Sequence, residues 1–132
     1  MLTFKNRIEL IHYKIGNAET EQGILIYQDV IYKMPAGKIS FAFRYALFAT
    51  DSYNSRIYAY ENDVLYSFSF PSYFYKGSRT YLMVNYNISK KIEIWLRYGR
   101  TLYSNKDMIS SGLTEIKGNT KSEVKVQVSV KF

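Results

Sequence analysis

Hydrophobic and polar residues alternate with a period of two along much of this chain, most strictly at its C-terminus. In residues 123–132 (EVKVQVSVKF), every second residue from Val124 to Phe132 is apolar, and the residues between them are polar or charged. Side chains of a β-strand point alternately to its two faces, so this segment is predicted to be an amphipathic strand. A tilted strand needs about ten residues to cross the hydrocarbon layer of a membrane, whereas strands of soluble proteins more often have about 5–6.

The segments 38–48, 80–88 and 91–101 repeat this alternation and carry no charge on the apolar parity before the strand ends. A charge on that parity near the middle of a membrane would cost about 2–4 kcal/mol, so its absence favours a lipid-facing surface. Ser89-Lys90 is predicted to form a tight hairpin turn between the last two of these strands.

Less regular strands are predicted over residues 3–14, 22–33 and 56–68. Gln28 interrupts the apolar positions of the second segment and Asn62 those of the third. A β-bulge near Asn62, or a covering segment, would account for the second interruption. The predicted fold is all-β, an antiparallel up-and-down meander of about seven long strands that is part of a transmembrane β-barrel.

The alternation also assigns side chains to the two faces of the predicted sheet. The apolar parity is predicted to face the membrane, through Phe41, Phe43, Ile92, Ile94, Leu96, Val124, Val126, Val128, Val130 and Phe132. The polar parity is predicted to face the lumen, through Arg44, Glu93, Arg97, Lys125 and Gln127. Such alternation between lipid-facing and lumen-facing residues is typical of membrane barrels.

The composition narrows the possible classes of protein. The chain has 14 Tyr, 8 Phe and no Cys, which excludes a disulfide scaffold, a thiol nucleophile and a Cys-ligated metal. The sequence has no apolar run long enough for a transmembrane helix. Aromatic residues recur near strand ends on the apolar parity, which favours an aromatic girdle at the membrane interface. A stacking platform for sugars or nucleotide bases is the alternative.

The net charge of +7 raises the question of a nucleic-acid partner. The basic residues are scattered without a cluster, so nucleic acid is not an expected partner. Solvated strand ends, a lumen lining and anionic lipid headgroups account for the same charge.

The C-terminal run resembles the terminal signature of Gram-negative outer-membrane barrel proteins, with apolar residues at alternate positions and a final Phe132. The resemblance implies that outer-membrane lipid and the insertion machinery are partners, and that the strand ends on the periplasmic side. Ser89-Lys90 and 51–55 then become periplasmic, and 34–37, 71–78 and 105–121 extracellular. The last of these matches the long external loops of this class.

The stretch 44–81 (RYALFATDSYNSRIYAYENDVLYSFSFPSYFYKGSRTY) resembles the barrel region of large outer-membrane proteins that are often known for an N-terminal helix-hairpin-helix segment. That segment does not occur in this sequence, so a role in DNA uptake is not carried over. An odd strand number and the absence of a signal peptide from residues 1–14 favour the C-terminal part of a larger barrel. The alternative is that the chain is not exported, in which case the barrel prediction fails. Residues 1–132 are therefore expected to be a single barrel segment, closed by upstream strands or another copy.

Catalysis is not expected, because nothing places a Ser beside His12 and no other catalytic motif is present. Carboxylates on the polar parity could form an acid/base pair or a calcium site, but ion pairs with Arg44, Arg97 and Lys125 are the better interpretation; these carboxylates are Asp29, Glu61, Asp63 and Glu93. No catalytic, cofactor or metal residue is predicted. The leading hypothesis is an outer-membrane pore, transporter or scaffold without enzymatic activity. A soluble β-barrel or sandwich that binds a small apolar or sugar ligand is the alternative, and a hydrolase with catalytic residues upstream is a third class.

Overall fold

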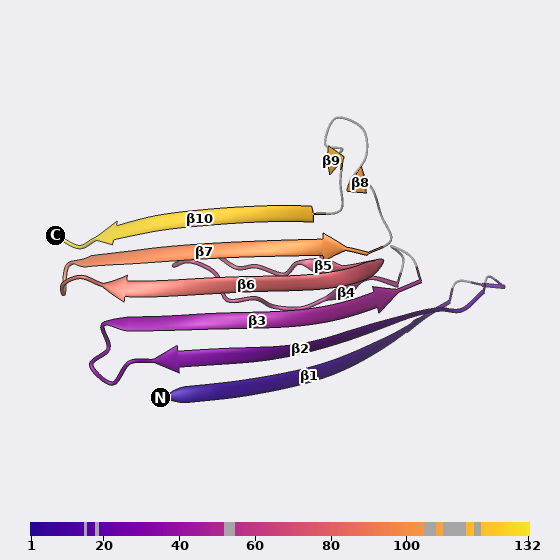
Figure 1. The fold of residues 1–132 in the computed structure, drawn as a ribbon, viewed down its shortest axis with the longest axis horizontal. Coiled ribbons are helices and arrows are strands. Elements are labelled where there is room, and N and C mark those ends of the chain that lie inside the picture. The colour runs from indigo at the N-terminus through magenta and orange to yellow at the C-terminus, as the bar shows by residue number, and fades with distance from the viewer. Residues whose placement is uncertain (15, 18, 52–54, 105–107, 110–115, 118–119) are drawn as a thin grey trace.

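The computed structural model describes residues 1–14, 16–17, 19–51, 55–104, 108–109, 116–117 and 120–132. Six long strands form one antiparallel sheet in the order β1-β2-β3-β6-β7-β10 (Figure 1). Their bounds are β1 Leu2–Tyr13, β2 Glu21–Lys33, β3 Ile39–Thr50, β6 Lys76–Asn87, β7 Ile92–Tyr103 and β10 Thr120–Val130. Each long strand is paired with the nearest long strand in sequence, which confirms the all-β class and the antiparallel meander.

Two short strand pairs and an isolated antiparallel bridge between Glu61 and Ser69 lie outside the main sheet. β4 (Ile57–Tyr58) pairs with β5 (Ser72–Tyr73), and β8 (Met108–Ile109) pairs with β9 (Ile116–Lys117). The main sheet is open, because among the described strands β1 pairs only with β2 and β10 only with β7. In the part of the chain that the structure describes, no helix is long and apolar enough to cross a membrane.

The prediction of a long strand over 56–68 is wrong, and the main sheet has six strands instead of about seven. β3 pairs directly with β6, and residues 55–75, here called the insert, lie against one face of the sheet. Alternation in the insert comes from packing on that face: Ile57, Ala59 and Glu61 are buried, whereas Tyr58 and Tyr60 are exposed. A period of two therefore does not distinguish a paired strand from an extended segment lying on a sheet.

The loss of that strand changes which connections share an end of the sheet. The turn at 34–38 and the turn at 88–91 lie at the same end as both chain termini, and the longer connections lie at the other end (Figure 1). The predicted opposite placement of 34–37 and 89–90 is therefore wrong. Asp51 also lies at the end opposite to these turns, where its backbone N–H donates to Gln22 O over 2.9 Å. Most of the predicted loop at 105–121 lies outside the described residues.

Cross-strand register arranges the apolar parity into rows across one face of the sheet, here called the outer face. One row contains only apolar and aromatic residues, in the order Leu2, Tyr32, Phe41, Val84, Leu96 and Val126. A second row, two rows further from the termini, is mostly polar: Asn6, Gln28, Tyr45, Thr80, Arg100 and Ser122. Gln28, which interrupts the alternation of its own strand, is thus one member of a polar row that crosses the whole sheet.

The hydrophobic core lies between the sheet and the insert. Leu25, Ala46, Phe48 and Tyr103 of the sheet and Ile57, Ala59 and Tyr73 of the insert form one buried cluster. The Phe48 ring packs edge-on against Tyr73, with ring centroids 5.4 Å apart. This cluster anchors the two ends of the insert, here called its root, close to where it leaves β3 and enters β6. Residues 61–70, here called the tip, lie beyond that core.

Candidate functional site: the charged inner face

The polar parity of the sheet forms the face that the insert covers, here called the inner face. One inner row runs Asp29, Arg44, Tyr81, Gly99 and Glu123 across five strands. Arg79 lies in the row on one side of it, and Arg97 and Lys125 lie together in the row on the other side. The strands thus bring four cations and two carboxylates into three adjacent rows, and the guanidinium groups of Arg44 and Arg97 lie over the Tyr81 ring.

Arg44 and Asp29 form a bidentate pair within the sheet. Arg44 Nε donates to Asp29 Oδ1 over 2.5 Å and Arg44 Nη2 donates to Asp29 Oδ2 over 2.8 Å, with both side chains buried. The guanidinium also lies 3.8 Å from the centroid of the Tyr27 ring. Its remaining nitrogen, Nη1, donates to the carbonyl oxygen of Tyr60 over 2.7 Å, so this sheet pair also holds the insert.

Glu61 of the insert is the centre of the largest group of ion pairs. Arg79 donates from Nε to Glu61 Oε1 over 2.6 Å and from Nη2 to Oε2 over 2.8 Å. Arg97 Nη2 donates to the same Oε2, and the Tyr73 hydroxyl donates to Oε1 over 2.8 Å. The side chain of Glu61 has no exposed surface. Charge-assisted bonds of this kind are roughly twice as strong as neutral ones.

Glu123 of β10 links the same two arginines from the other side. Its Oε1 accepts hydrogen bonds from Arg79 Nη2 over 2.6 Å and from Arg97 Nη1 over 3.0 Å. Arg79 Nη1 donates to Thr101 Oγ1 over 2.8 Å, which fixes the remaining edge of that guanidinium. Arg97 Nε donates to the carbonyl oxygen of Asn62 over 3.0 Å.

Gly99 provides the space for this arrangement. A Cβ atom at Gly99 would lie 2.8 Å from Glu123 Oε1 and 3.3 Å from Arg79 Nη2. The first distance is shorter than side chains tolerate, so any larger residue would force Glu123 away from the arginines. The absence of a side chain at Gly99 therefore lets Glu123 lie close to both arginines.

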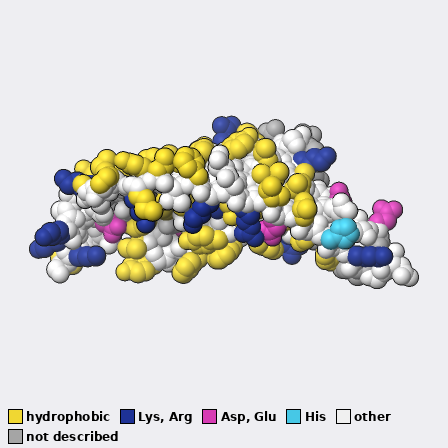
Figure 2. Space-filling view, turned by 90° about the horizontal axis from the view of Figure 1, so that it is seen from below, with side chains coloured by type: hydrophobic (Ala, Val, Ile, Leu, Met, Phe, Trp, Pro, Cys, Tyr) yellow, Lys and Arg dark blue, Asp and Glu magenta, His cyan; other side chains and the backbone are white. Residues whose placement is uncertain are grey.

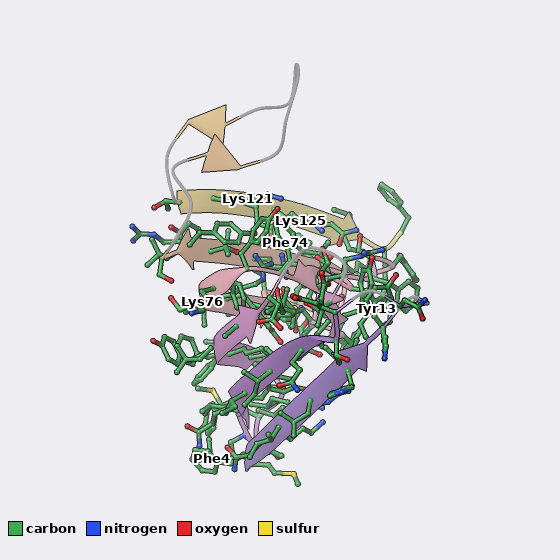
Figure 3. All side chains as sticks on the ribbon, turned by 90° about the vertical axis from the view of Figure 1, so that its right-hand side faces the viewer. Phe4, Tyr13, Phe74, Lys76, Lys121 and Lys125 are labelled. Atoms are coloured by element: carbon green, nitrogen blue, oxygen red, sulfur yellow. The ribbon has the colours of Figure 1, made fainter. Side chains whose placement is uncertain are left out.

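A second carboxylate of the tip, Asp63, pairs with β10. Lys125 Nζ donates to Asp63 Oδ2 over 2.6 Å, and the backbone N–H of Val64 donates to Asp63 Oδ1 over 2.8 Å. Asn62, between the two acidic residues, donates from its backbone and side chain to the Tyr81 hydroxyl over 3.2 Å. Figure 3 looks along the strands from the end with the long connections and shows Phe74 of the insert gathered with Lys121 and Lys125 on one side of the sheet.

The charges of this network balance only when the insert is in place. The sheet contributes Arg44, Arg79, Arg97 and Lys125, and its own carboxylates there are Asp29 and Glu123. Glu61 and Asp63 of the insert bring the two missing negative charges. Because an unpaired buried charge is strongly unfavourable, the insert and the inner face stabilise each other electrostatically.

The protonation of Tyr73 follows from its place at the root of the insert. Burial, followed by the nearby Glu61 carboxylate, raises the pKa of the Tyr73 hydroxyl. The hydroxyl therefore stays protonated and remains a hydrogen-bond donor to Glu61 throughout the neutral pH range.

The inner-face residues predicted from the sequence all take part in this region or lie beside it. The predicted pairing of the carboxylates is confirmed for Asp29 with Arg44, Glu61 with Arg97, and Asp63 with Lys125. Glu93 instead accepts a hydrogen bond from Asn85 Nδ2 over 2.8 Å, and Gln127 is half-buried nearby. His12 is exposed and lies in register with Gln22.

Sequence reasoning missed Arg79, Tyr73 and Glu123 as members of the network. Arg79 directly precedes the predicted strand 80–88, and β6 in fact begins at Lys76. The parity of Arg79, shared with Tyr81, would have placed it on the inner face once the strand was extended. No pattern in the sequence indicated the role of Tyr73, because that role depends on the insert folding back onto the sheet.

The residues predicted to face the membrane lie on the outer face, opposite these ion pairs. Val124, Val126, Val128 and Val130 of β10 are all at least half exposed, as is Phe132 beyond the strand, and Leu96 is 44% exposed. Phe41, Phe43, Ile92 and Ile94 are half-buried. Figure 2 shows hydrophobic side chains on two opposite surfaces, with charged side chains between them.

Among the described residues, no group of three or more His, Asp or Glu side chains is placed to hold a metal ion. Comparisons with protein-family models, with curated proteins and with solved structures found no match to this chain.

Proposed function

We propose that this chain forms six strands in the wall of an outer-membrane β-barrel, with the insert occupying part of the lumen. The observation that carries this proposal is the division of one sheet into an apolar, exposed outer face and a charged inner face. The long strands have 11–13 residues each, which is enough to cross the hydrocarbon layer when tilted. The resemblance of the final strand to the terminal signature of outer-membrane barrels supports the same proposal.

The two kinds of row on the outer face suggest where the membrane lies. An Arg side chain is costly at the midplane of a barrel but nearly free of cost near the interface, where the penalty is about 0–1 kcal/mol. The row that contains Arg100 and Tyr45 is therefore proposed to lie at the membrane interface on the side of the long connections. The exposed apolar residues of the next row, such as Leu47 and Leu102, would then lie at the level of the lipid headgroups. The row through Phe41 and Val126 lies within the band. The short turns at the other end are then periplasmic.

The position of the insert on the inner face favours a transporter or a scaffold over a permanently open pore. It covers the inner face at Arg44, Arg79 and Arg97, and it neutralises charges that would otherwise line the passage. An unobstructed diffusion channel would leave such a polar wall in contact with water. We propose that passage of a solute through this region requires the tip of the insert to move.

Closure of the barrel requires further strands beside β1 and β10. In hydrocarbon, each unpaired backbone N–H or C=O costs several kcal/mol, so open sheet edges do not occur there. Because β1 and β10 run in opposite directions at the two edges, an even number of added antiparallel strands would close the sheet. We propose that upstream strands of a longer protein, or another copy, complete the wall.

The single tryptophan gives a direct test of the outer face. Trp95 has the parity of the inner face, whereas its neighbour Leu96 belongs to the outer apolar row. In vesicles that contain brominated lipid, the fluorescence of native Trp95 should be weakly quenched. A matched variant with Trp95→Phe and Leu96→Trp should be strongly quenched, because its indole would contact acyl chains. Equal quenching of the two proteins would contradict the membrane proposal.

A groove on the outer face supports a second candidate, a soluble protein that binds an apolar ligand. The groove has a volume of about 560 Å³, and its lining includes Ile24, Ile26, Tyr45, Leu47 and Leu102. Recovery of the protein from the aqueous fraction without detergent, together with saturable binding of an apolar fluorescent dye that Leu47→Glu abolishes, would favour this function. Extraction from membranes only by detergent would favour the barrel.

A further inference from the structure

The carboxylate of Glu61 lies in a pocket built by residues outside the tip of the insert. Tyr73, Arg79 and Arg97 all donate to it, and the two guanidinium groups approach both of its oxygens. Planar guanidinium groups match the geometry of a carboxylate better than any other side chain does. The donors that surround both oxygens of this fully buried carboxylate are the arrangement expected of a binding site for a carboxylate ligand.

The walls of this pocket are held in place without Glu61. Thr101 and Glu123 accept hydrogen bonds from Arg79, and Glu123 also accepts one from Arg97. Tyr73 is packed against Phe48 in the hydrophobic core. Because each wall residue has a second anchor, removal of Glu61 would leave the donors near their present positions. Such preorganisation reduces the free-energy cost of binding a ligand.

The charge left in the pocket defines the ligand. Without Glu61, the guanidinium groups of Arg79 and Arg97 would share only the Glu123 carboxylate, which leaves one uncompensated positive charge. Asp63 is 3.9 Å from Arg97 but is engaged with Lys125 at 2.6 Å. The pocket therefore matches a single negative charge, as a monocarboxylate has, better than a divalent anion.

The part of the insert that carries Glu61 is held mainly by polar contacts. The tip contacts the sheet through Glu61, Asp63 and the amide groups of Asn62. Val64 is its one buried apolar side chain, and Tyr66 and Phe68 are 90% and 80% exposed. The apolar contacts with the core belong to the root, which includes Ile57 and Tyr73. The tip can therefore leave the inner face while the root and the wall of the pocket remain.

We propose that the pocket formed by Tyr73, Arg79 and Arg97 is a binding site for the carboxylate group of a solute, and that Glu61 occupies it as an internal ligand. A solute carboxylate that enters from the inner side competes with Glu61 for the two arginines. The tip of the insert is released when the solute binds. This assignment concerns the inner face alone, so it stands whether the outer face contacts lipid or not.

The test is rescue of a cavity variant by acetate. Glu61→Ala removes the carboxylate and leaves room for a small anion, whereas Glu61→Gln fills the same space without charge. The midpoint of thermal unfolding is measured in detergent micelles at constant ionic strength, with sodium chloride replaced stepwise by sodium acetate. We expect acetate to raise the midpoint of Glu61→Ala in a saturable manner. The midpoints of the wild type and of Glu61→Gln should not change.

Two controls separate a binding site from a general effect of salt. Acetamide has the shape of acetate without its charge and should not rescue Glu61→Ala, and sulfate should rescue less than acetate does. If Glu61→Ala folds only poorly, its refolding yield in acetate relative to chloride replaces the midpoint. The proposal is overturned if acetate and chloride give the same midpoint or yield, or if acetate acts equally on Glu61→Gln.

Discussion

Glu61 and Arg97 lie 36 positions apart in the chain, and their side chains meet in an ion pair at which both are buried. Neither residue is buried by its own segment: Arg97 lies in the middle of β7, and Glu61 lies at the start of the tip. Only the return of the insert onto the sheet removes both groups from water. The stability of the insert therefore depends on this contact.

Replacement of Glu61 by Gln is expected to lower the free energy of unfolding by about 3–5 kcal/mol, because two buried arginines would lose a common counterion. Glu123→Gln is the matched control. Its side chain is 36% exposed, so solvent screens its charge and the loss should be much smaller. Urea unfolding in detergent micelles, followed by Trp95 fluorescence, measures both. Equal losses for the two variants would contradict the central place of Glu61.

Charge reversal at Lys125 is expected to loosen the tip of the insert. Lys125→Glu would oppose Asp63 at the position where the two side chains now form an ion pair 2.6 Å long. A protease that cleaves after aromatic residues should then cut faster at the exposed Tyr66 and Phe68. Lys121→Glu, on the same strand and of the same parity, should leave the cleavage rate close to that of the wild type. Similar rates for both variants would exclude a specific role for Lys125.

Addition of a methyl group at Gly99 is expected to destabilise the protein by about 1–3 kcal/mol, as overpacking does in other buried sites. Gly77→Ala should be worse, because its Cβ would lie 2.0 Å from the backbone oxygen of Leu102, which cannot move as a side chain does. Ser78→Ala, next to Gly77, adds no atom and serves as the control. Denaturant unfolding of the three variants gives the order, and a tolerated Gly77→Ala would contradict the close approach of β6 and β7.

Alkaline pH is expected to weaken the attachment of the insert through Tyr73. The pKa of this hydroxyl is raised in the folded protein by burial and by Glu61, above the usual value of about 10 that it has when unfolded. The unfolded state therefore releases this proton first, and the stability that Tyr73 contributes is present below about pH 10 and declines above it. Tyr73→Phe should show a smaller decline in unfolding free energy between pH 9 and 11. An identical decline in both proteins would contradict the shift.

A positive charge on the outer face is expected to hinder membrane insertion. Val126→Arg would place a charge in the apolar row and cost about 2–4 kcal/mol if that row lies near the midplane. Gln127→Arg, the next residue, points to the inner face and should be tolerated better. Folding yield into lipid vesicles, measured by the mobility shift of folded protein on gels, compares the two. Equal yields would place the outer face in water.

The alternation of single strands was enough to predict much of this fold. The segments 38–48, 80–88, 91–101 and 123–132 all lie within or largely within long strands of the sheet, because a paired strand with one apolar face requires a period of two. The same parity placed Arg44, Arg97 and Lys125 on one face and Val124, Val126 and Val128 on the other. These are local consequences of strand geometry, which a sequence carries within about ten residues.

The course of the insert was decided only by tertiary contacts. Residues 56–68 have the alternation of a strand. Nothing within that segment indicates that Glu61 and Asp63 form ion pairs with cations of β6, β7 and β10. The contacts of Glu61 with Arg79 and Arg97 span 18 and 36 positions, far beyond the range of a local pattern. Because the sheet has one strand fewer than predicted, the connections at 34–37 and 51–55 lie at the opposite ends of the sheet from those expected. Each strand of a meander takes the chain from one end of the sheet to the other. Local periodicity determines which face a side chain takes, and only long-range charge pairing and packing determine whether an extended segment joins the sheet or lies upon it.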